Sequence, residues 1–255
     1  MTEDIALRAR RRTRTVVVAA GAVLLLLVAV VSGAAVALTE HPEAKPTDGP
    51  SLPSTGGATP GDRTDTAGPA ATPAATAPVS WITVAGARVP VSAAAGPSTS
   101  DAGQARGFAP TPLGAVLAAA HISVQLSAQA GPAVFEPTLR EQVIGPDAAA
   151  LAEQVEHSYQ QARAQLGLPH GEPAGHLYST VRGYRIDVES EDRPTVRLLI
   201  EGPGASGGSV LVSLVVQMQW VDTDWALVAP DGGLWSSATS IVTDPAGYTS
   251  FPRGG

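Results

Sequence analysis

A long strand is predicted over Ser209-Val-Leu-Val-Ser-Leu-Val-Val-Gln-Met-Gln-Trp220. Apolar residues recur there at every second position, which is typical of a strand with one face in the core. The core face is expected to carry Val210, Val212, Leu214, Val216, Met218 and Trp220. On the other face, Leu211 and Val215 are apolar where a strand that only meets solvent would be polar. These two residues are a candidate partner surface, unless the chain's own tail around Tyr248 and Phe251 covers them.

Three further strands are predicted around this one. Residues 184–189 alternate apolar and charged side chains, and residues 195–201 and 225–229 are short apolar-rich runs. Their connections are short and rich in Gly, Asp and Ser, which favours an antiparallel meander. The connection at residues 202–207 matches the glycine spacing of a dinucleotide-binding loop, but such a loop must be followed by a helix. Because a strand is predicted next, this connection is interpreted as a hairpin loop.

Three helices are predicted before the meander. The first has Thr111 as its N-cap and Pro112 at its first helical position, and Gly131-Pro132 is expected to end it. The second covers residues 137–143, and the third runs over residues 147–166. The many alanines of the first helix predict that it packs closely against the sheet.

A small hairpin is predicted ahead of the helices. Two β-branched runs, residues 81–84 and 89–91, flank a turn that contains Gly86. Pro90 cannot donate a backbone hydrogen bond, so the second run is expected to be an edge strand. Residues 93–107 are small and polar and are predicted to be a connection without regular structure.

The order of these elements predicts an α+β domain over residues 79–255. In this domain, three helices pack on a curved four-stranded antiparallel sheet to give a cone-like fold. Tail residues Trp235, Tyr248 and Phe251 are expected to lie against the domain.

Five stretches of residues 81–251 resemble an uncharacterised actinobacterial family of membrane-anchored proteins. They are Trp81 with Pro90-Val91-Ser92, Gly107-Phe-Ala-Pro-Thr-Pro-Leu-Gly-Ala115, Phe135-Glu-Pro-Thr138, Glu201-Gly-Pro-Gly204 and Asp224-Trp-Ala-Leu-Val-Ala-Pro230. This resemblance implies no activity. The layout is also similar to the ketosteroid-isomerase-like, or nuclear-transport-factor-2-like, extracytoplasmic domains of conjugation and type IV secretion assembly factors. That likeness implies a scaffold role in an envelope assembly.

A transmembrane helix is predicted over residues 16–38, whose only polar side chain is Ser32. As a helix this run is about 34 Å long, which is enough for the roughly 30 Å of bilayer hydrocarbon. Five arginines lie in residues 1–15, and an excess of basic residues marks the cytoplasmic side of a span. We therefore expect a cytoplasmic tail, a contact with the bilayer through residues 16–38, and an extracellular C-terminal domain.

A cleaved secretory signal is the alternative interpretation of this run. Ala35-Val36-Ala37 has the small residues of a cleavage site. Signal cores usually contain only about 7–15 apolar residues, however, and this run is longer.

Residues 39–78 are predicted to be a disordered linker. The stretch is rich in Pro, Thr, Ala and Gly, and such a composition cannot bury enough apolar surface to offset the entropy of ordering it. A spacer through a cell wall and an inert connection are both consistent with this composition.

Composition narrows the function. The net charge is −7 although five basic residues precede the predicted span, so the expected ectodomain is acidic and no nucleic-acid partner is expected. The chain has no cysteine, and its five histidines show no helical His-x-x-x-His pair, so no metal site is predicted. No cofactor and no small-molecule ligand is identified.

No catalytic set is recognised in the sequence, because a nucleophile elbow is lacking. In an enzymatic cone, an Asp base and a Tyr donor would occupy the pocket, and Tyr159, Tyr178, Tyr184 and Asp187 are candidates by residue type alone. The function expected from the sequence is a non-enzymatic, single-pass membrane protein with an extracytoplasmic scaffold domain that binds envelope proteins, as in a conjugation or secretion assembly. The alternative is a cone that binds a small ligand or acts as an enzyme.

Overall fold

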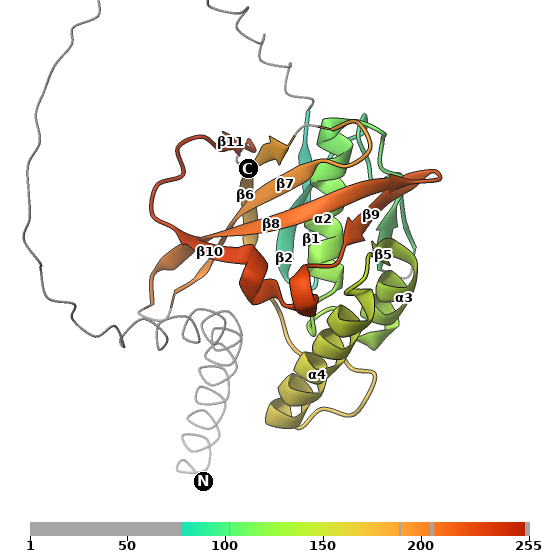
Figure 1. Cartoon of the computed structure of the whole chain (residues 1–255). Helices are drawn as coiled ribbons and strands as arrows, with labels where there is room; N and C mark the ends of the chain where they lie inside the picture. The colour runs from blue at the N-terminus through green and yellow to red at the C-terminus, as the bar shows by residue number, and fades with distance from the viewer. Residues whose placement is uncertain (1–77, 102, 189, 205–206, 253–255) are drawn as a thin grey trace, which may run out of the picture.

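The computed structural model describes residues 78–101, 103–188, 190–204 and 207–252 (Figure 1). Its helices are α2 (Pro112–Gln125), α3 (Pro132–Gln142) and α4 (Ala148–Leu166), with short 3-10 turns η2 (Asp231–Gly233) and η3 (Trp235–Ala238). Its strands are β1 (Ser80–Val84), β2 (Ala87–Val91), β3 (Thr99–Asp101), β4 (Gln104–Arg106), β5 (Val143–Ile144), β6 (Thr180–Val188), β7 (Thr195–Pro203), β8 (Ser209–Val221), β9 (Asp224–Val228), β10 (Thr239–Val242) and β11 (Thr249–Ser250). The predicted cytoplasmic tail, transmembrane helix and nearly all of the linker, over residues 1–77, lie outside the described residues.

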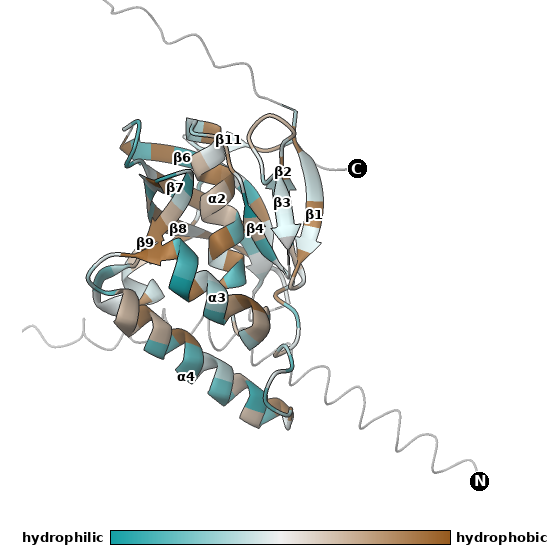
Figure 2. Cartoon of the chain, turned by 90° about the vertical axis from the view of Figure 1, so that its right-hand side faces the viewer, coloured by the Kyte–Doolittle hydropathy of each residue, from teal (hydrophilic) through white to brown (hydrophobic). Residues whose placement is uncertain are grey.

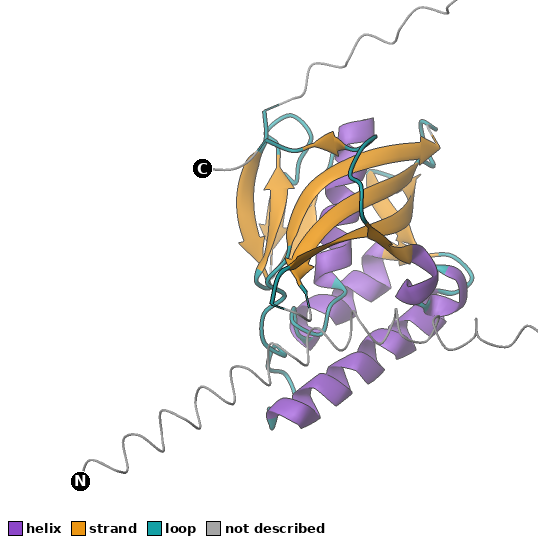
Figure 3. Ribbon diagram, turned by 90° about the vertical axis from the view of Figure 1, so that its left-hand side faces the viewer, coloured by secondary structure: helices purple, strands orange, loops and turns teal. Residues whose placement is uncertain are grey.

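Nine of the strands form one curled, mixed sheet. The order is β1-β2-β6-β7-β8-β9-β5, with β10 paired to β8 and β11 paired to β6, while β3 and β4 form a separate hairpin. The sheet curves around α2 like a half-barrel, and α3 and α4 lie beyond its open end (Figure 3). Among the described residues, no helix has the length and apolar character that a membrane span requires.

The predicted meander is present as β6, β7, β8 and β9, which pair antiparallel in sequence order. The predicted cone with a four-stranded antiparallel sheet is nevertheless wrong. Two parallel pairings, β2 with β6 and β5 with β9, extend the sheet at both sides. Each involves only one or two residue pairs, and such short pairings leave no periodic signal in the sequence.

Helix α2 is the centre of the core rather than an amphipathic surface helix. Every residue from Gly114 to Ile122 is buried, including four alanines that allow the close packing predicted from the sequence. Figure 2 shows α2 largely in apolar colours inside the fold, whereas α4 carries polar colours along its length. A helix that is apolar all round is expected to be enclosed on all sides, as observed.

The predicted helix boundaries are partly confirmed. Thr111 caps α2, since its Oγ1 accepts a hydrogen bond from the Gly114 N–H at 3.1 Å. The helix ends at Gln125, well before Gly131, because the chain turns at Leu126. Helix α3 begins earlier than predicted and contains Pro137, whereas α4 has the predicted limits and ends at Gly167 in the left-handed conformation.

The N-terminal hairpin of β1 and β2 is confirmed, but its predicted edge is wrong. Strand β1, not β2, lies at the edge of the sheet. Pro90 is tolerated in β2 because the pairing with β6 joins Arg88 to Thr180 and does not reach Pro90. The predicted connection at residues 93–107 also contains the β3–β4 hairpin.

The two ends of the described chain meet. The Phe251 ring is buried against Tyr184 at 5.1 Å and Trp81 at 6.1 Å between ring centroids. The indole N–H of Trp81 donates to the Pro252 carbonyl at 3.1 Å. The prediction that the tail lies against the domain is confirmed.

Candidate functional site

Three segments that are distant in the sequence form an open pocket of about 580 Å³. The first is the loop of residues 92–98 after β2, the second is the segment of residues 107–110 before α2, and the third is the β8–β9 hairpin tip around residues 220–223. Pockets for small ligands have volumes in this range. We call this site the hairpin pocket.

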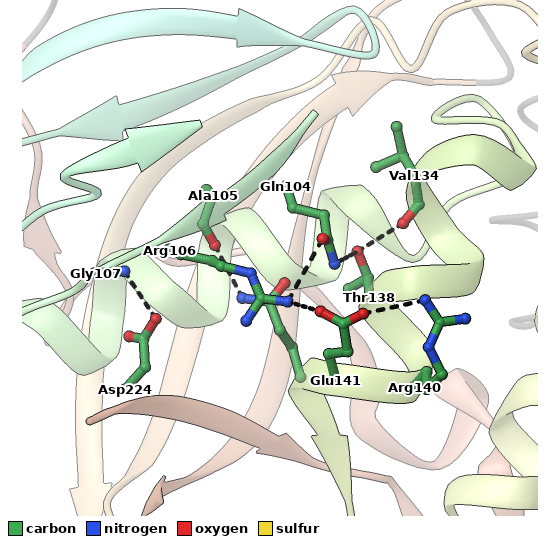
Figure 4. A network of polar contacts seen from close by, with 10 residues as sticks. Gln104, Ala105, Arg106, Gly107, Val134, Thr138, Arg140, Glu141 and Asp224 are labelled. Carbon is green, nitrogen blue, oxygen red and sulfur yellow. Dashed lines mark hydrogen bonds and ion pairs between the residues drawn. The ribbon is translucent and has the colours of Figure 1, made fainter. Parts of the chain in front are cut away.

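The carboxylate of Asp224 holds two of these segments together. Its Oδ2 accepts a hydrogen bond from the Gly107 N–H at 2.8 Å, and its Oδ1 accepts from the N–H groups of Phe108 at 3.1 Å and Trp225 at 2.9 Å. Figure 4 shows Asp224 pointing at Gly107. Hydrogen bonds to an ionised group are stronger than neutral ones, so this contact fixes the segment before α2 on β9.

Trp225 completes the same junction. Its ring is buried, and its indole N–H donates to the Ala109 carbonyl at 2.8 Å. Gly114 lies against that carbonyl, because an added Cβ would sit 2.0 Å from the Ala109 oxygen. A side chain at position 114 would therefore push the segment away from β9.

The loop of residues 92–98 is held by its own backbone. The Ser92 carbonyl accepts from the Gly96 N–H at 2.8 Å, and the Gly96 carbonyl accepts from the Ser92 N–H at 2.9 Å. The Ala109 N–H donates to the Ala95 carbonyl at 3.1 Å, which joins the loop to the second segment. The hairpin pocket is therefore a preformed feature of the backbone.

Small apolar and aromatic residues line the pocket together with four polar ones, Ser92, Ser98, Asp222 and Thr223. Phe108 is almost fully buried beneath it, and Trp220 packs edge-on against Trp225 at 5.2 Å between ring centroids. The half-buried Trp220 ring makes no hydrogen bond through its indole N–H with any described residue. Asp222 is the single ionisable side chain among the described residues that line the pocket.

His121 lies behind the pocket floor. Its ring packs on Phe108 at 5.7 Å, and its Nε2–H donates to the Pro90 carbonyl at 3.0 Å, which fixes the neutral tautomer. The Nδ1 atom is buried and has no partner among the described residues. Burial lowers the pKa of His121 from 6.5 to about 4, although the bond to Pro90 acts in the opposite direction.

A second polar network joins β4 to α3 (Figure 4). Arg106 pairs with Glu141, and the Gln142 amide donates to the Ala105 carbonyl at 2.9 Å. Gln104 contacts Thr138 at 3.4 Å. These contacts fasten the β3–β4 hairpin on α3, and none of their residues lines the hairpin pocket, so we interpret the network as structural.

The structure places Leu211 and Val215 on the sheet face opposite α2, and both are half-buried. Leu211 is in register with Val242 of β10, and Val215 with Arg197 of β7. The electrostatic contact of Arg197 with Tyr248 puts part of the tail at this face. The partner surface at Leu211 and Val215 stays a prediction.

The four candidates for acid–base chemistry do not converge. Tyr159 is buried in the core and exchanges hydrogen bonds with the Glu172 carbonyl and the Gly171 N–H, while Tyr178 is exposed. Tyr184 packs on Phe251, and its pKa is raised by burial. Asp187 is paired with Arg197 and Arg185, and these bonds hold the pKa of its carboxyl below the usual value.

The described histidines are likewise dispersed. His157 contacts Gln161, His170 packs on Tyr159, and His176 packs on Tyr178. Within the described ranges, no group of three His, Cys, Asp or Glu side chains could hold a metal ion. Residues 202–207 connect the antiparallel strands β7 and β8, which confirms the hairpin and excludes the dinucleotide-binding geometry.

Sequence reasoning missed the hairpin pocket. Trp220 was expected on the core face of its strand and is only half-buried, whereas the neighbouring Trp225 is fully buried. Parts of two stretches singled out above line the pocket, Ser92 and residues 107–110, and Asp224 of a third stretch bonds to Gly107 and Phe108. The resemblance therefore already drew attention to residues of this site, but nothing in the local sequence pattern indicates that these stretches meet in the fold.

Comparison with known proteins identifies one domain. A family model described as Domain of unknown function (DUF8175) matches residues 40–250. No curated protein and no solved structure matches the chain.

The buried His121 predicts a pH-dependent stability. Because its folded pKa of about 4 is below the unfolded value, the unfolded state binds a proton between pH 6.5 and 4 that the folded state does not. The contribution of the buried, neutral His121 to the free energy of unfolding is complete above pH 6.5 and is lost as the pH falls towards 4. In urea titrations of a fragment of residues 39–255, the free energy of unfolding should fall by about 2 kcal/mol from pH 7.5 to pH 5 because of this group.

His121→Gln keeps a donor towards Pro90 without a titrating ring, so it should remove this part of the pH dependence. His157→Gln, at an exposed position on α4, is the matched control and should leave it unchanged. An equal pH slope in all three proteins would contradict the assignment.

Proposed function

We propose that this chain, which belongs to the family described as Domain of unknown function (DUF8175), is a membrane-anchored binding protein. In this proposal a single span holds an extracytoplasmic domain that engages protein partners of the cell envelope and catalyses no reaction. The hairpin pocket is its partner site.

The chemistry of the hairpin pocket is the observation that supports binding over catalysis. Alanine, glycine, proline and aromatic residues form most of its lining, and its polar side chains are the hydroxyls of Ser92, Ser98 and Thr223 and one carboxylate, Asp222, at the exposed rim. General acid–base or nucleophilic chemistry needs two or more polar groups that converge on one reacting atom. Apolar contact with a few orienting hydrogen bonds is instead the character of a recognition site.

The membrane part of the proposal is supported by the sequence. The apolar run of residues 16–38 follows an arginine-rich tail, and about 40 residues separate it from the folded domain. A flexible connection of that length has a root-mean-square reach near 35 Å. It would let the pocket meet partners away from the bilayer surface.

The two more specific functions expected from the sequence, a role in conjugation or secretion and an enzymatic activity, are less well supported. The conjugation and secretion version was inferred from a cone-like layout, and the nine-stranded mixed sheet removes that ground. The enzymatic alternative relied on tyrosines and an aspartate that lie apart from one another. We therefore propose a general envelope-binding role.

The topology can be tested with single cysteines, because the chain has none of its own. Ser236→Cys, at an exposed position in η3, should react with a membrane-impermeant maleimide on intact protoplasts. Asp4→Cys, in the expected cytoplasmic tail, should react only after lysis. Labelling of Asp4→Cys in intact cells, or protection of Ser236→Cys, would overturn the proposed orientation.

The partner site can be tested by cross-linking in living cells. A photo-activated cross-linker on Ser98→Cys, at the pocket rim, should trap an envelope protein, and Thr223→Arg should reduce that adduct at least tenfold by blocking the pocket. Thr243→Arg makes the same change at an exposed threonine away from the pocket and should have no effect.

Leu211→Glu with Val215→Glu separates the two candidate surfaces. If the pocket is the partner site, this double variant keeps the adduct whenever its domain is folded. Loss of the adduct in a stable double variant, together with full cross-linking in Thr223→Arg, would move the contact to the sheet face.

A further inference from the structure

The chain enters the folded domain beside the hairpin pocket. Ser80, at the start of β1, is paired with Val91 in the hairpin, and the next residue, Ser92, is the first of the pocket loop. The 77 residues before Pro78 therefore approach the domain within one or two residues of the pocket rim.

The stretch that arrives there has an unusual composition. Residues 66–87 contain no charged side chain, and residues 69–76 repeat Pro-Ala-Ala-Thr twice. Chains of this kind favour the polyproline II conformation, which leaves their backbone carbonyls without internal hydrogen bonds. Such a segment offers apolar ridges and free acceptors to a binding surface.

The hairpin pocket has the complementary groups. Aromatic-lined grooves are the general solution for binding proline-containing extended segments. The half-buried Trp220 ring provides the accessible aromatic surface above the buried Phe108, and its indole N–H is a donor without a partner among the described residues. The sole ionisable lining group, Asp222, lies at the exposed rim, so an uncharged segment loses no charge pairing there.

We propose that the hairpin pocket binds the chain's own Pro-Ala-Ala-Thr stretch, residues 69–76, as an extended segment. The inference deepens the proposed function, since it assigns a resident occupant to the partner site. The stretch ends at Thr76, and only Ala77 lies between it and Pro78, the first described residue, so the bound segment would begin directly beside the pocket rim.

Covalent linkage makes this occupant effective even if its contacts are weak. A segment on a short flexible connection has an effective concentration on the order of millimolar at a site it can reach. A partner must then displace the stretch, so the pocket selects partners that bind more tightly or carry a similar proline-containing segment. Release of the stretch also lengthens the connection to the membrane.

The test uses the full chain in lipid nanodiscs and a labelled peptide of residues 68–78. In one variant, residues 69–76 are replaced by a Gly-Ser segment of equal length, and in the control the same replacement is made at residues 52–59. Fluorescence anisotropy should show the peptide binding at least tenfold more tightly to the first variant than to the wild type or the control. The open pocket binds the peptide, whereas the occupied pocket excludes it.

Two substitutions place the binding in the pocket. In the chain with residues 69–76 replaced, Thr223→Arg should abolish peptide binding, and Trp220→Phe should weaken it several-fold while keeping the aromatic contact with Trp225. Far-ultraviolet circular dichroism confirms that both variants are folded.

Three results would overturn the inference. They are equal binding to the wild type and the replaced chain, no binding to the replaced chain, and binding that Thr223→Arg does not change. None of these measurements depends on membrane orientation or on an envelope partner, so a failure here is distinguishable from a failure of the proposed function.

Discussion

The carboxylate of Asp224 is the contact on which the arrangement of the domain depends. It accepts three backbone N–H groups, two of them from residues more than a hundred positions earlier in the chain. Together with the indole of Trp225, it fixes the segment that leads into α2 against the first residues of β9. The start of α2 therefore has a fixed position relative to β9, and the hairpin pocket forms beside that start.

This contact explains how an open pocket forms where three surface segments of the domain meet. The walls of the pocket are backbone segments whose hydrogen bonds are satisfied within the loop or by Asp224, so the site needs no buried charge of its own. Close packing of Gly114 on the Ala109 carbonyl leaves no space for the segment to shift. The pocket is closely packed at its base and open to solvent above.

Local features of the sequence predicted the elements well. Thr111 and Pro112 marked the start of α2, alternation predicted β6 and β8, and short apolar-rich runs predicted β7 and β9. The sheet could not be completed in this way, because β5 and β2 join it through one or two residue pairs that depend on tertiary packing. The pocket was missed for the same reason, since Asp224 and Gly107 show no pattern that relates one to the other.

The most direct test of this account is amide hydrogen exchange in Asp224→Asn. An asparagine can accept through only one of its side-chain atoms, so at least one of the Gly107 and Phe108 amides loses its acceptor. A hydrogen bond to a charged group contributes about 1.5–3 kcal/mol, so exchange at one or both of these amides should accelerate by roughly 10- to 100-fold. The amides of Leu198 and Leu199 in the centre of β7 should be unaffected. Unchanged exchange at Gly107 and Phe108, or equal acceleration across the whole sheet, would contradict the central role assigned to Asp224.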